Sequence, residues 1–133
     1  MTEKQLHSAV CRYIATQYPK VAFHTDMSGV YLSGKWSLMR DLKNNNSASG
    51  FPDLTVWHRS GQYNGLAIEL KAEGKRPYKR NGELKDDDHL RSQKQWLDLM
   101  TSWGWKAVFA TGFDEAKIII DLYLNEKLQA PKL

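Results

Sequence analysis

Two short segments near the middle of the chain constrain the possible folds more than any other feature of the sequence. Residues 53–57 and 66–71 both alternate apolar with other side chains, which is the period of two that a half-buried β-strand requires. The residues between them favour a turn, because they include Ser60, Gly61, Asn64 and Gly65. The simplest prediction is an antiparallel β-hairpin.

The alternation also separates the side chains of the hairpin by chemistry. One face is aliphatic and consists of Leu54, Val56, Leu66, Ile68 and Leu70. Asp53, Glu69 and Lys71 project from the opposite face, because successive side chains of a strand point to opposite sides. We therefore expect a hydrophobic core under one face and a charged cluster on the other.

A hairpin centred on Gly61 would place Asp53 directly opposite Glu69, whereas a bulge would place the two diagonally. Directly opposed side chains have Cβ atoms ~4.5–5.5 Å apart, and like charges in such a pair repel. The pair therefore needs a proton, a basic side chain such as Lys71, or a divalent cation. Mg²⁺ suits it, because this ion prefers carboxylate oxygens, water, phosphate oxygens and a carbonyl such as that of Leu70.

Helices are expected on both sides of the hairpin in the sequence. The first begins after Thr2, which forms a capping-box pattern with Gln5, and ends at Tyr18, because the residue before a proline avoids the α region. The second covers residues 88–103. Its expected apolar stripe consists of Trp96, Leu97, Met100 and Trp103.

A last helix is expected to have Asp114 as its N-cap, with Phe113 packed against Ile118. Further expected segments are strands at 21–24, 30–32 and 105–110, an irregular or helical stretch at 35–43, a polar loop at 44–47 and a mobile loop at 72–87. The order is α-β-β-β-β-α-β-α without an internal repeat. It predicts one mixed α/β domain over residues 1–133, with a central sheet flanked by helices.

The sequence Gly50-Phe51-Pro52-Asp53, followed after fifteen residues by Glu69-Leu70-Lys71, resembles the signature of the PD-(D/E)xK nucleases. It is most similar to the VRR-NUC branch, which is related to Holliday-junction resolvases and often found as stand-alone phage or prophage proteins. In that branch a glycine precedes the Pro-Asp pair, and a helix carrying a glutamine follows, a place that Gln93 fits. The resemblance covers about residues 2–125 and implies a restriction-endonuclease-like core of order αβββαβ.

The resemblance implies a Mg²⁺-dependent endonuclease, with Mn²⁺ able to substitute. Asp53 and Glu69 would hold the metal with the Leu70 carbonyl, and Lys71 would orient or deprotonate the attacking water, leaving a 5′-phosphate and a 3′-hydroxyl. The amide of Gln93 would be buried and must find a partner, either on the active-site strand or at a loop carbonyl. Glu3 joins the metal site in this interpretation, although an acidic residue in the first turn of a helix is stabilised by the helix dipole alone.

Basic residues identify the expected DNA contacts. The chain has 19 Lys and Arg against 15 Asp and Glu, a net charge of +4, which is compatible with a polyanionic partner. Cations follow the second strand of the hairpin closely, at Lys75, Arg76, Lys79 and Arg80. Arg40 and Lys43, which precede an Asn-rich stretch, are second-rank candidates for phosphate contact.

Other classes of protein are disfavoured. The lone Cys11 can form no intrachain disulfide, and the four histidines are scattered without zinc-ligand spacing. No apolar run reaches the ~20 residues of a membrane span, and the first residues lack the apolar core of a secretory signal. The expected location is the cytoplasm of a bacterium or of a phage-infected host cell.

Three functions are compatible with these features. The first is an endonuclease selective for branched, Holliday-junction-like DNA, acting as a homodimer because similar resolvases pair two sites to cut two strands. The second is a restriction-type or flap endonuclease on the same core, although 133 residues leave little surface for reading base edges. The third is a non-catalytic regulatory protein that binds nucleic acid. The intact Asp53, Glu69 and Lys71 argue against it.

Overall fold

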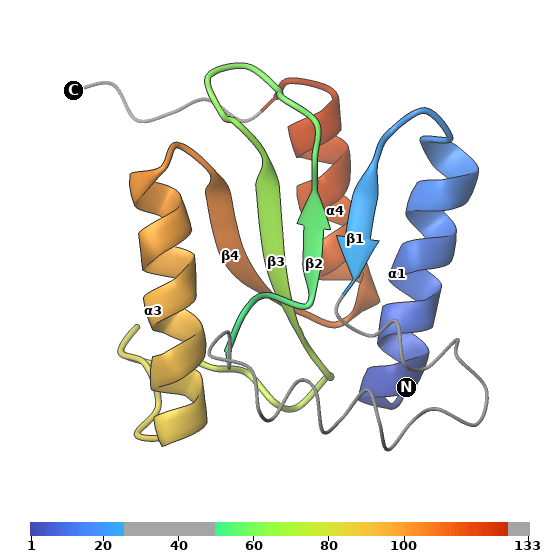
Figure 1. Ribbon diagram of the computed structural model, residues 1–133. Helices are drawn as coiled ribbons and strands as arrows, with labels where there is room; N and C mark the ends of the chain where they lie inside the picture. The colour runs from blue at the N-terminus through green and yellow to red at the C-terminus, as the bar shows by residue number, and fades with distance from the viewer. Residues whose placement is uncertain (26–49, 128–133) are drawn as a thin grey trace, which may run out of the picture.

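The computed structural model describes residues 1–25 and 50–127. The strand expected at 30–32, the stretches at 35–43 and 44–47, and the candidate contacts Arg40 and Lys43 lie outside the described residues. The helices and strands are α1 Glu3–Gln17, β1 Phe23–Thr25, β2 Leu54–Val56, β3 Leu66–Lys71, α3 Asp88–Ser102, β4 Lys106–Thr111 and α4 Phe113–Leu124 (Figure 1).

The strands form one mixed sheet in the order β1-β2-β3-β4. β1 and β3 both run antiparallel to β2, and β4 runs parallel to β3. The parallel pair is joined through α3, as a parallel connection requires a crossover. In β2 and β3, Leu54 pairs with Ile68 and Val56 with Leu66. The predicted hairpin and its centre at Gly61 are therefore confirmed.

Helices cover both faces of the sheet (Figure 1). The aliphatic face of β2 and β3 packs with α1 and α4 into one hydrophobic cluster, which includes Val10, Ile14, Ile68 and Ile120. α3 covers the other face, where Gln93 contacts Glu69 and Lys71 of β3. The second face of the hairpin is thus largely buried, which is why Thr55 and Ala67 are as inaccessible as their aliphatic neighbours.

Helix termini agree only in part with the expectations. The capping box of Thr2 and Gln5 is present, and α1 ends at Tyr18 as its C-cap. The predicted N-cap Asp114 was wrong, because α4 begins two residues earlier than expected, with Gly112 as N-cap. Phe113 packs on Tyr13 of α1 instead of Ile118, which is 57% exposed. Trp103 is the C-cap of α3 and is 53% exposed, so its assignment to the apolar stripe was also wrong.

Residues 72–87, expected to be a mobile loop, contain a small hairpin that is closed at residues 77–85, and the segment is called the 72–87 hairpin below. The Lys79 N–H donates to the Glu83 carbonyl at 2.7 Å, and the Lys85 N–H donates to the Pro77 carbonyl at 2.9 Å. Tyr78 and Leu84 form a β-bridge between these bonds. The turn contains Asn81-Gly82, a hairpin-forming pair that the high charge of the segment obscured.

α1 and α4 are joined by a partly buried polar contact. The hydroxyls of Tyr13 and Tyr18 donate to Asp121 Oδ1 at 2.5 and 2.7 Å, and Lys117 Nζ donates to Oδ2 at 3.2 Å. Burial alone would raise the pKa of Asp121, but these hydrogen bonds and the Lys117 ammonium outweigh it and lower that pKa. Burial, then the bond to Asp121, raises the pKa of Tyr18 to about 12.

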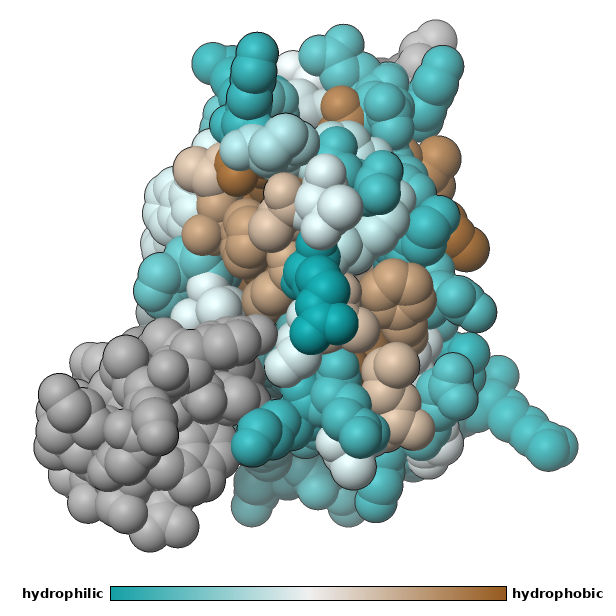
Figure 2. All heavy atoms as spheres, turned by 90° about the vertical axis from the view of Figure 1, so that its right-hand side faces the viewer, coloured by the Kyte–Doolittle hydropathy of each residue, from teal (hydrophilic) through white to brown (hydrophobic). Residues whose placement is uncertain are grey.

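The face on which α1 lies exposes hydrophobic patches among hydrophilic side chains (Figure 2). A shallow groove of about 400 Å³ between α1 and β1 is lined partly by Cys11, Ala15 and Phe23. Among the described residues, no helix combines the length and the hydropathy that crossing a membrane would demand.

Replacing Asp121 with asparagine should destabilise the fold in a pH-dependent way. Because the pKa of Asp121 is lower in the folded chain, its contribution is present above the unfolded value of about 3.9 and is lost as the pH falls through the folded value. At pH 7 the loss should be about 1–3 kcal/mol, the usual size for hydrogen bonds to a charged group. Urea unfolding at pH 7 and pH 3 measures it, and an equal difference between the two proteins at both pH values would contradict this account.

Candidate active site

Two carboxylates are buried together at one end of the hairpin. Asp53 lies directly before β2, and the register of β2 on β3, continued by one residue, sets it opposite Glu69. Asp53 is 4% exposed and Glu69 3% exposed. Burying two like charges is costly unless hydrogen bonds or opposite charges compensate, so their partners are informative.

Backbone groups hold both carboxylates in place. The Leu70 N–H donates to Asp53 Oδ2 at 3.0 Å, and the Asp53 N–H donates to Glu69 Oε2 at 3.2 Å. Each carboxylate is therefore fixed to the other strand by a main-chain donor, which partly offsets their repulsion. The main-chain group of Leu70 that contacts Asp53 is its N–H. Binding of a metal by the Leu70 carbonyl stays a prediction.

Gln93 of α3 forms hydrogen bonds with both Glu69 and Lys71 of β3. Its Nε2 donates to Glu69 Oε1 at 2.7 Å, and its Oε1 accepts from Lys71 Nζ at 2.7 Å. His89, one turn earlier, lies 3.1 Å from Nε2 through its own Nε2. A carboxylate requires a donor and an ammonium requires an acceptor, so the two neighbours fix the orientation of the amide. Of the two partners expected for Gln93, a strand or a loop carbonyl, the structure shows the strand, β3.

α1 brings a histidine to the carboxylates that was not identified from the sequence. His7 is buried, and its Nε2 lies 3.6 Å from Asp53 Oδ2 and 4.0 Å from Glu3 Oε1. Ligand atoms of Glu3, His7 and Asp53 all lie within 4.8 Å of one another. Carboxylate oxygens and a neutral imidazole nitrogen suit a divalent cation, so these residues fit a metal site.

A signal for His7 was present in the sequence. Glu3 and His7 are four residues apart and therefore lie on one helix face, beside the buried Leu6 and Val10. The spacing of the four histidines from one another did not single out His7, because the carboxylate that it meets, Asp53, lies in a segment far from it in the chain.

Gly50 shapes the segment that delivers Asp53. Its φ is +89°, and a Cβ there would meet Ser92 of α3 at 2.5 Å from Oγ and 3.0 Å from the backbone carbon. The next residue, Phe51, packs edge-on against Trp96, with ring centroids 5.2 Å apart. The chain before β2 is therefore pressed onto α3, the helix that also carries Gln93.

The predicted DNA-contacting cations lie on the 72–87 hairpin. Lys75, Arg76, Lys79 and Arg80 are all exposed, and Arg76 makes a loose contact with Glu115 at 3.4 Å. Lys71 connects this hairpin to the carboxylate site, because its Nζ lies 5.8 Å from the centroid of Phe109, on which Tyr78 packs.

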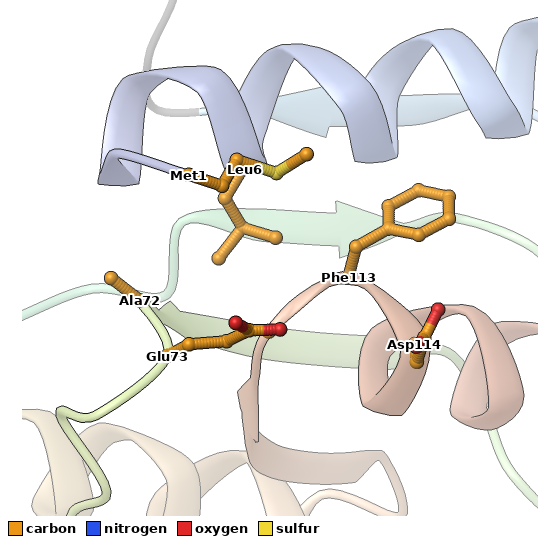
Figure 3. A pocket seen from close by; sticks show the side chains of 7 residues that line it. Met1, Leu6, Ala72, Glu73, Phe113 and Asp114 are labelled. Carbon is orange, nitrogen blue, oxygen red and sulfur yellow. The ribbon is translucent and has the colours of Figure 1, made fainter.

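A hollow of about 230 Å³ lies on the other side of the β3 terminus (Figure 3). Met1, Leu6 and Phe113 give it apolar walls, and the carboxylates of Glu73 and Asp114 are its charged lining groups. Phosphates would be repelled there. A polyanion that reaches the carboxylate site is therefore favoured on the side of the 72–87 hairpin.

Comparison with known proteins agrees with this geometry. Residues 3–114 match the family model described as the VRR-NUC domain. A solved structure described as a VRR_NUC domain protein is 22% identical with a TM-score of 0.64, covering 94% of this chain and 89% of that one. None of the curated proteins compared with the chain matches it in sequence. The expected α/β core is confirmed.

Replacing Gly50 with alanine should destabilise the fold more than the same change at Gly74. Both glycines have positive φ (+89° and +83°), but a Cβ at Gly74 would meet nothing within 4 Å. Gly74→Ala should cost about 1–2 kcal/mol for the left-handed conformation alone, and Gly50→Ala about 1–3 kcal/mol more for the clash with Ser92. Equal losses of unfolding free energy in the two variants, measured with urea, would show that the close approach of Gly50 to Ser92 does not limit the side chain at position 50.

Proposed function

The chain belongs to the VRR-NUC domain family, which consists of nuclease domains, and on this premise we propose that it is a metal-dependent endonuclease that hydrolyses DNA phosphodiester bonds. The observation that carries the proposal is the cluster of the buried Asp53, Glu69 and Gln93 with the half-buried Lys71, held together by hydrogen bonds of 2.7–3.2 Å. These residue types can hold a cation, place a base and stabilise negative charge.

The metal would be held by Asp53 and Glu69, with the Leu70 carbonyl, and Glu3 and His7 of α1 would add further ligands. Mg²⁺ is the proposed ion, with Mn²⁺ as a substitute. When bound, such an ion polarises the scissile phosphate and acidifies water. The chain's own contribution is to fix the carboxylates through main-chain donors before any substrate arrives, which reduces the reorganisation needed during reaction.

Lys71 and Gln93 would act on the water and on the charge of the transition state. The Gln93 carbonyl holds the Lys71 ammonium at 2.7 Å, which restricts a long and otherwise flexible side chain. Lys71 would orient or deprotonate the attacking water and offset charge on the phosphate. In-line attack leaves a 5′-phosphate and a 3′-hydroxyl.

Branched DNA is the proposed substrate, cut by a homodimer in the cytoplasm of a bacterium or of a phage-infected host cell. The exposed cations of the 72–87 hairpin, which lies next to Lys71, support a DNA-binding surface there. A restriction-type or flap endonuclease on the same core is the second candidate. A non-catalytic regulator is less well supported, because a binding surface has no use for two buried carboxylates with dedicated partners.

Cleavage should require a divalent ion and both carboxylates. Asp53→Ala and Glu69→Ala should each lower single-turnover cleavage by about 100-fold or more, since metal-ion catalysis contributes several kcal/mol. Mg²⁺ should raise the melting temperature of the wild type more than that of Asp53→Asn, because ligand binding stabilises the folded state.

The matched control is Asp86→Ala, since Asp86 is exposed and pairs with Arg91 away from the site. This variant should cleave and respond to Mg²⁺ like the wild type. Cleavage by the wild type in excess EDTA would overturn the proposal.

Removing the Gln93 amide should impair the chemical step more than DNA binding. Gln93→Ala frees Lys71 and leaves Glu69 without one hydrogen bond, and losing such a supporting partner typically costs 10–100-fold in activity or metal affinity. Gln95→Ala is the control, because Gln95 lies on the same helix but is exposed. Single-turnover rates in Mg²⁺ and binding in Ca²⁺ separate the two effects. A loss confined to DNA binding would contradict the assigned role.

A further inference from the structure

A second pocket lies between the 72–87 hairpin and β4, next to the proposed catalytic residues. Its volume is about 280 Å³, and its lining includes Tyr78, Phe109, Thr111 and three cations of the hairpin, Arg76, Lys79 and Arg80. Glu115 also lines it and pairs loosely with Arg76, so the cations remain in excess. This is near the lower end of the usual range for ligand pockets, so it suits one small planar group rather than a larger ligand.

The pocket combines aromatic surface with positive charge. The rings of Tyr78 and Phe109 meet edge to face, with centroids 5.8 Å apart and an angle of 83°. Phe109 is 8% exposed, whereas Tyr78 is 39% exposed, so the tyrosine presents ring surface to an incoming group. Proteins that bind single-stranded nucleic acid use this combination, stacking bases on aromatic rings while cations contact the phosphates.

The sheet fixes the distance between this pocket and the catalytic residues. Phe109 is the register partner of Glu69, and Thr111 is the partner of Lys71, so all four side chains share the face covered by α3. Lys71 Nζ lies 5.8 Å from the Phe109 centroid. A group bound against Phe109 is therefore adjacent to a phosphate engaged by Lys71.

We infer that this pocket binds one unpaired nucleobase next to the scissile phosphate, stacked on Tyr78, with its flanking phosphates held by Arg76, Lys79 and Arg80. A base inside a duplex is stacked on both sides and cannot enter such a pocket without leaving the helix. The inference rests on the proposed function and narrows its substrate class. The preferred branched substrate is one that carries an unpaired nucleotide, such as a flap or a single-stranded branch, and not a fully paired four-way junction. This preference places the flap-endonuclease candidate ahead of cutting at a paired junction, and a gap supplies the same unpaired nucleotide without a branch.

The test compares substrates of one sequence as a flap, a single-nucleotide gap, a four-way junction and a linear duplex. Binding is measured in Ca²⁺ and single-turnover cleavage in Mg²⁺. In the flap and the gap, 2-aminopurine replaces the unpaired base beside the cut, so stacking in the pocket lowers its fluorescence. The variants are Tyr78→Ala, Tyr78→Leu, Tyr78→Phe and the control Trp103→Ala, which removes an exposed aromatic residue at the C-terminus of α3.

The wild type and Tyr78→Phe should bind the flap and the gap more tightly than the paired substrates and should quench 2-aminopurine. Tyr78→Ala should bind the flap about 5- to 100-fold more weakly, the range for loss of one base–aromatic stack, with duplex binding unchanged. Tyr78→Leu keeps apolar contact with Phe109 but lacks the ring, so it should behave like Tyr78→Ala. Trp103→Ala should match the wild type.

Equal binding of all four substrates by the wild type would overturn the inference. So would unchanged quenching in Tyr78→Ala, or a loss of equal size on duplex and flap. A wild type that cleaves none of the substrates under any divalent ion would instead overturn the proposed function, and the fluorescence measurement would still decide whether the pocket holds a base.

Discussion

Burial of Asp53 and Glu69 is the constraint on which the arrangement of the other elements depends. Two carboxylates that are 4% and 3% exposed lose most of their hydration, so the fold must supply donors and positive charge around them. Those partners come from the main chain of the hairpin itself, from Gln93 of α3, which also accepts a hydrogen bond from Lys71, and from His7 of α1. The two helices at the site, α1 and α3, each contribute a polar side chain to it, His7 and Gln93, in addition to the apolar side chains that pack on the sheet.

The two faces of the sheet divide these tasks. The face toward α1 and α4 is a continuous aliphatic cluster, which supplies the hydrophobic stabilisation of the fold. The face toward α3 carries Glu69 and Lys71, which contact the Gln93 amide, together with Phe109 and Thr111. Because β-strand side chains alternate, the hairpin of β2 and β3 contributes side chains to both faces of the sheet. A shift of one residue in its register would turn the aliphatic side chains toward α3 and the charged ones toward the hydrophobic core.

The charges around the site are distributed unequally. Glu73 and Asp114 lie by the hollow between α1 and α4, whereas the exposed cations of the 72–87 hairpin lie on the other side of the β3 terminus. This asymmetry favours the approach of a polyanion from one direction only. Closure of the 72–87 hairpin by main-chain hydrogen bonds gives the cations and Tyr78 a defined position relative to Lys71, which an open loop would not.

The sequence by itself determined those features that depend on local periodicity. Alternation at 53–57 and 66–71 was enough to predict the hairpin and the shared face of Asp53, Glu69 and Lys71, and helical spacing placed Gln93 on the inward side of α3. The sequence left two registers open, and the structure shows the one centred on Gly61. The tertiary structure alone decided which helix covers which face, and with it the meeting of His7 with Asp53 and of Tyr78 with Phe109. Such contacts join segments far apart in the chain. No local pattern predicts these pairings, since what brings the side chains together is the packing of whole helices and the closure of a turn.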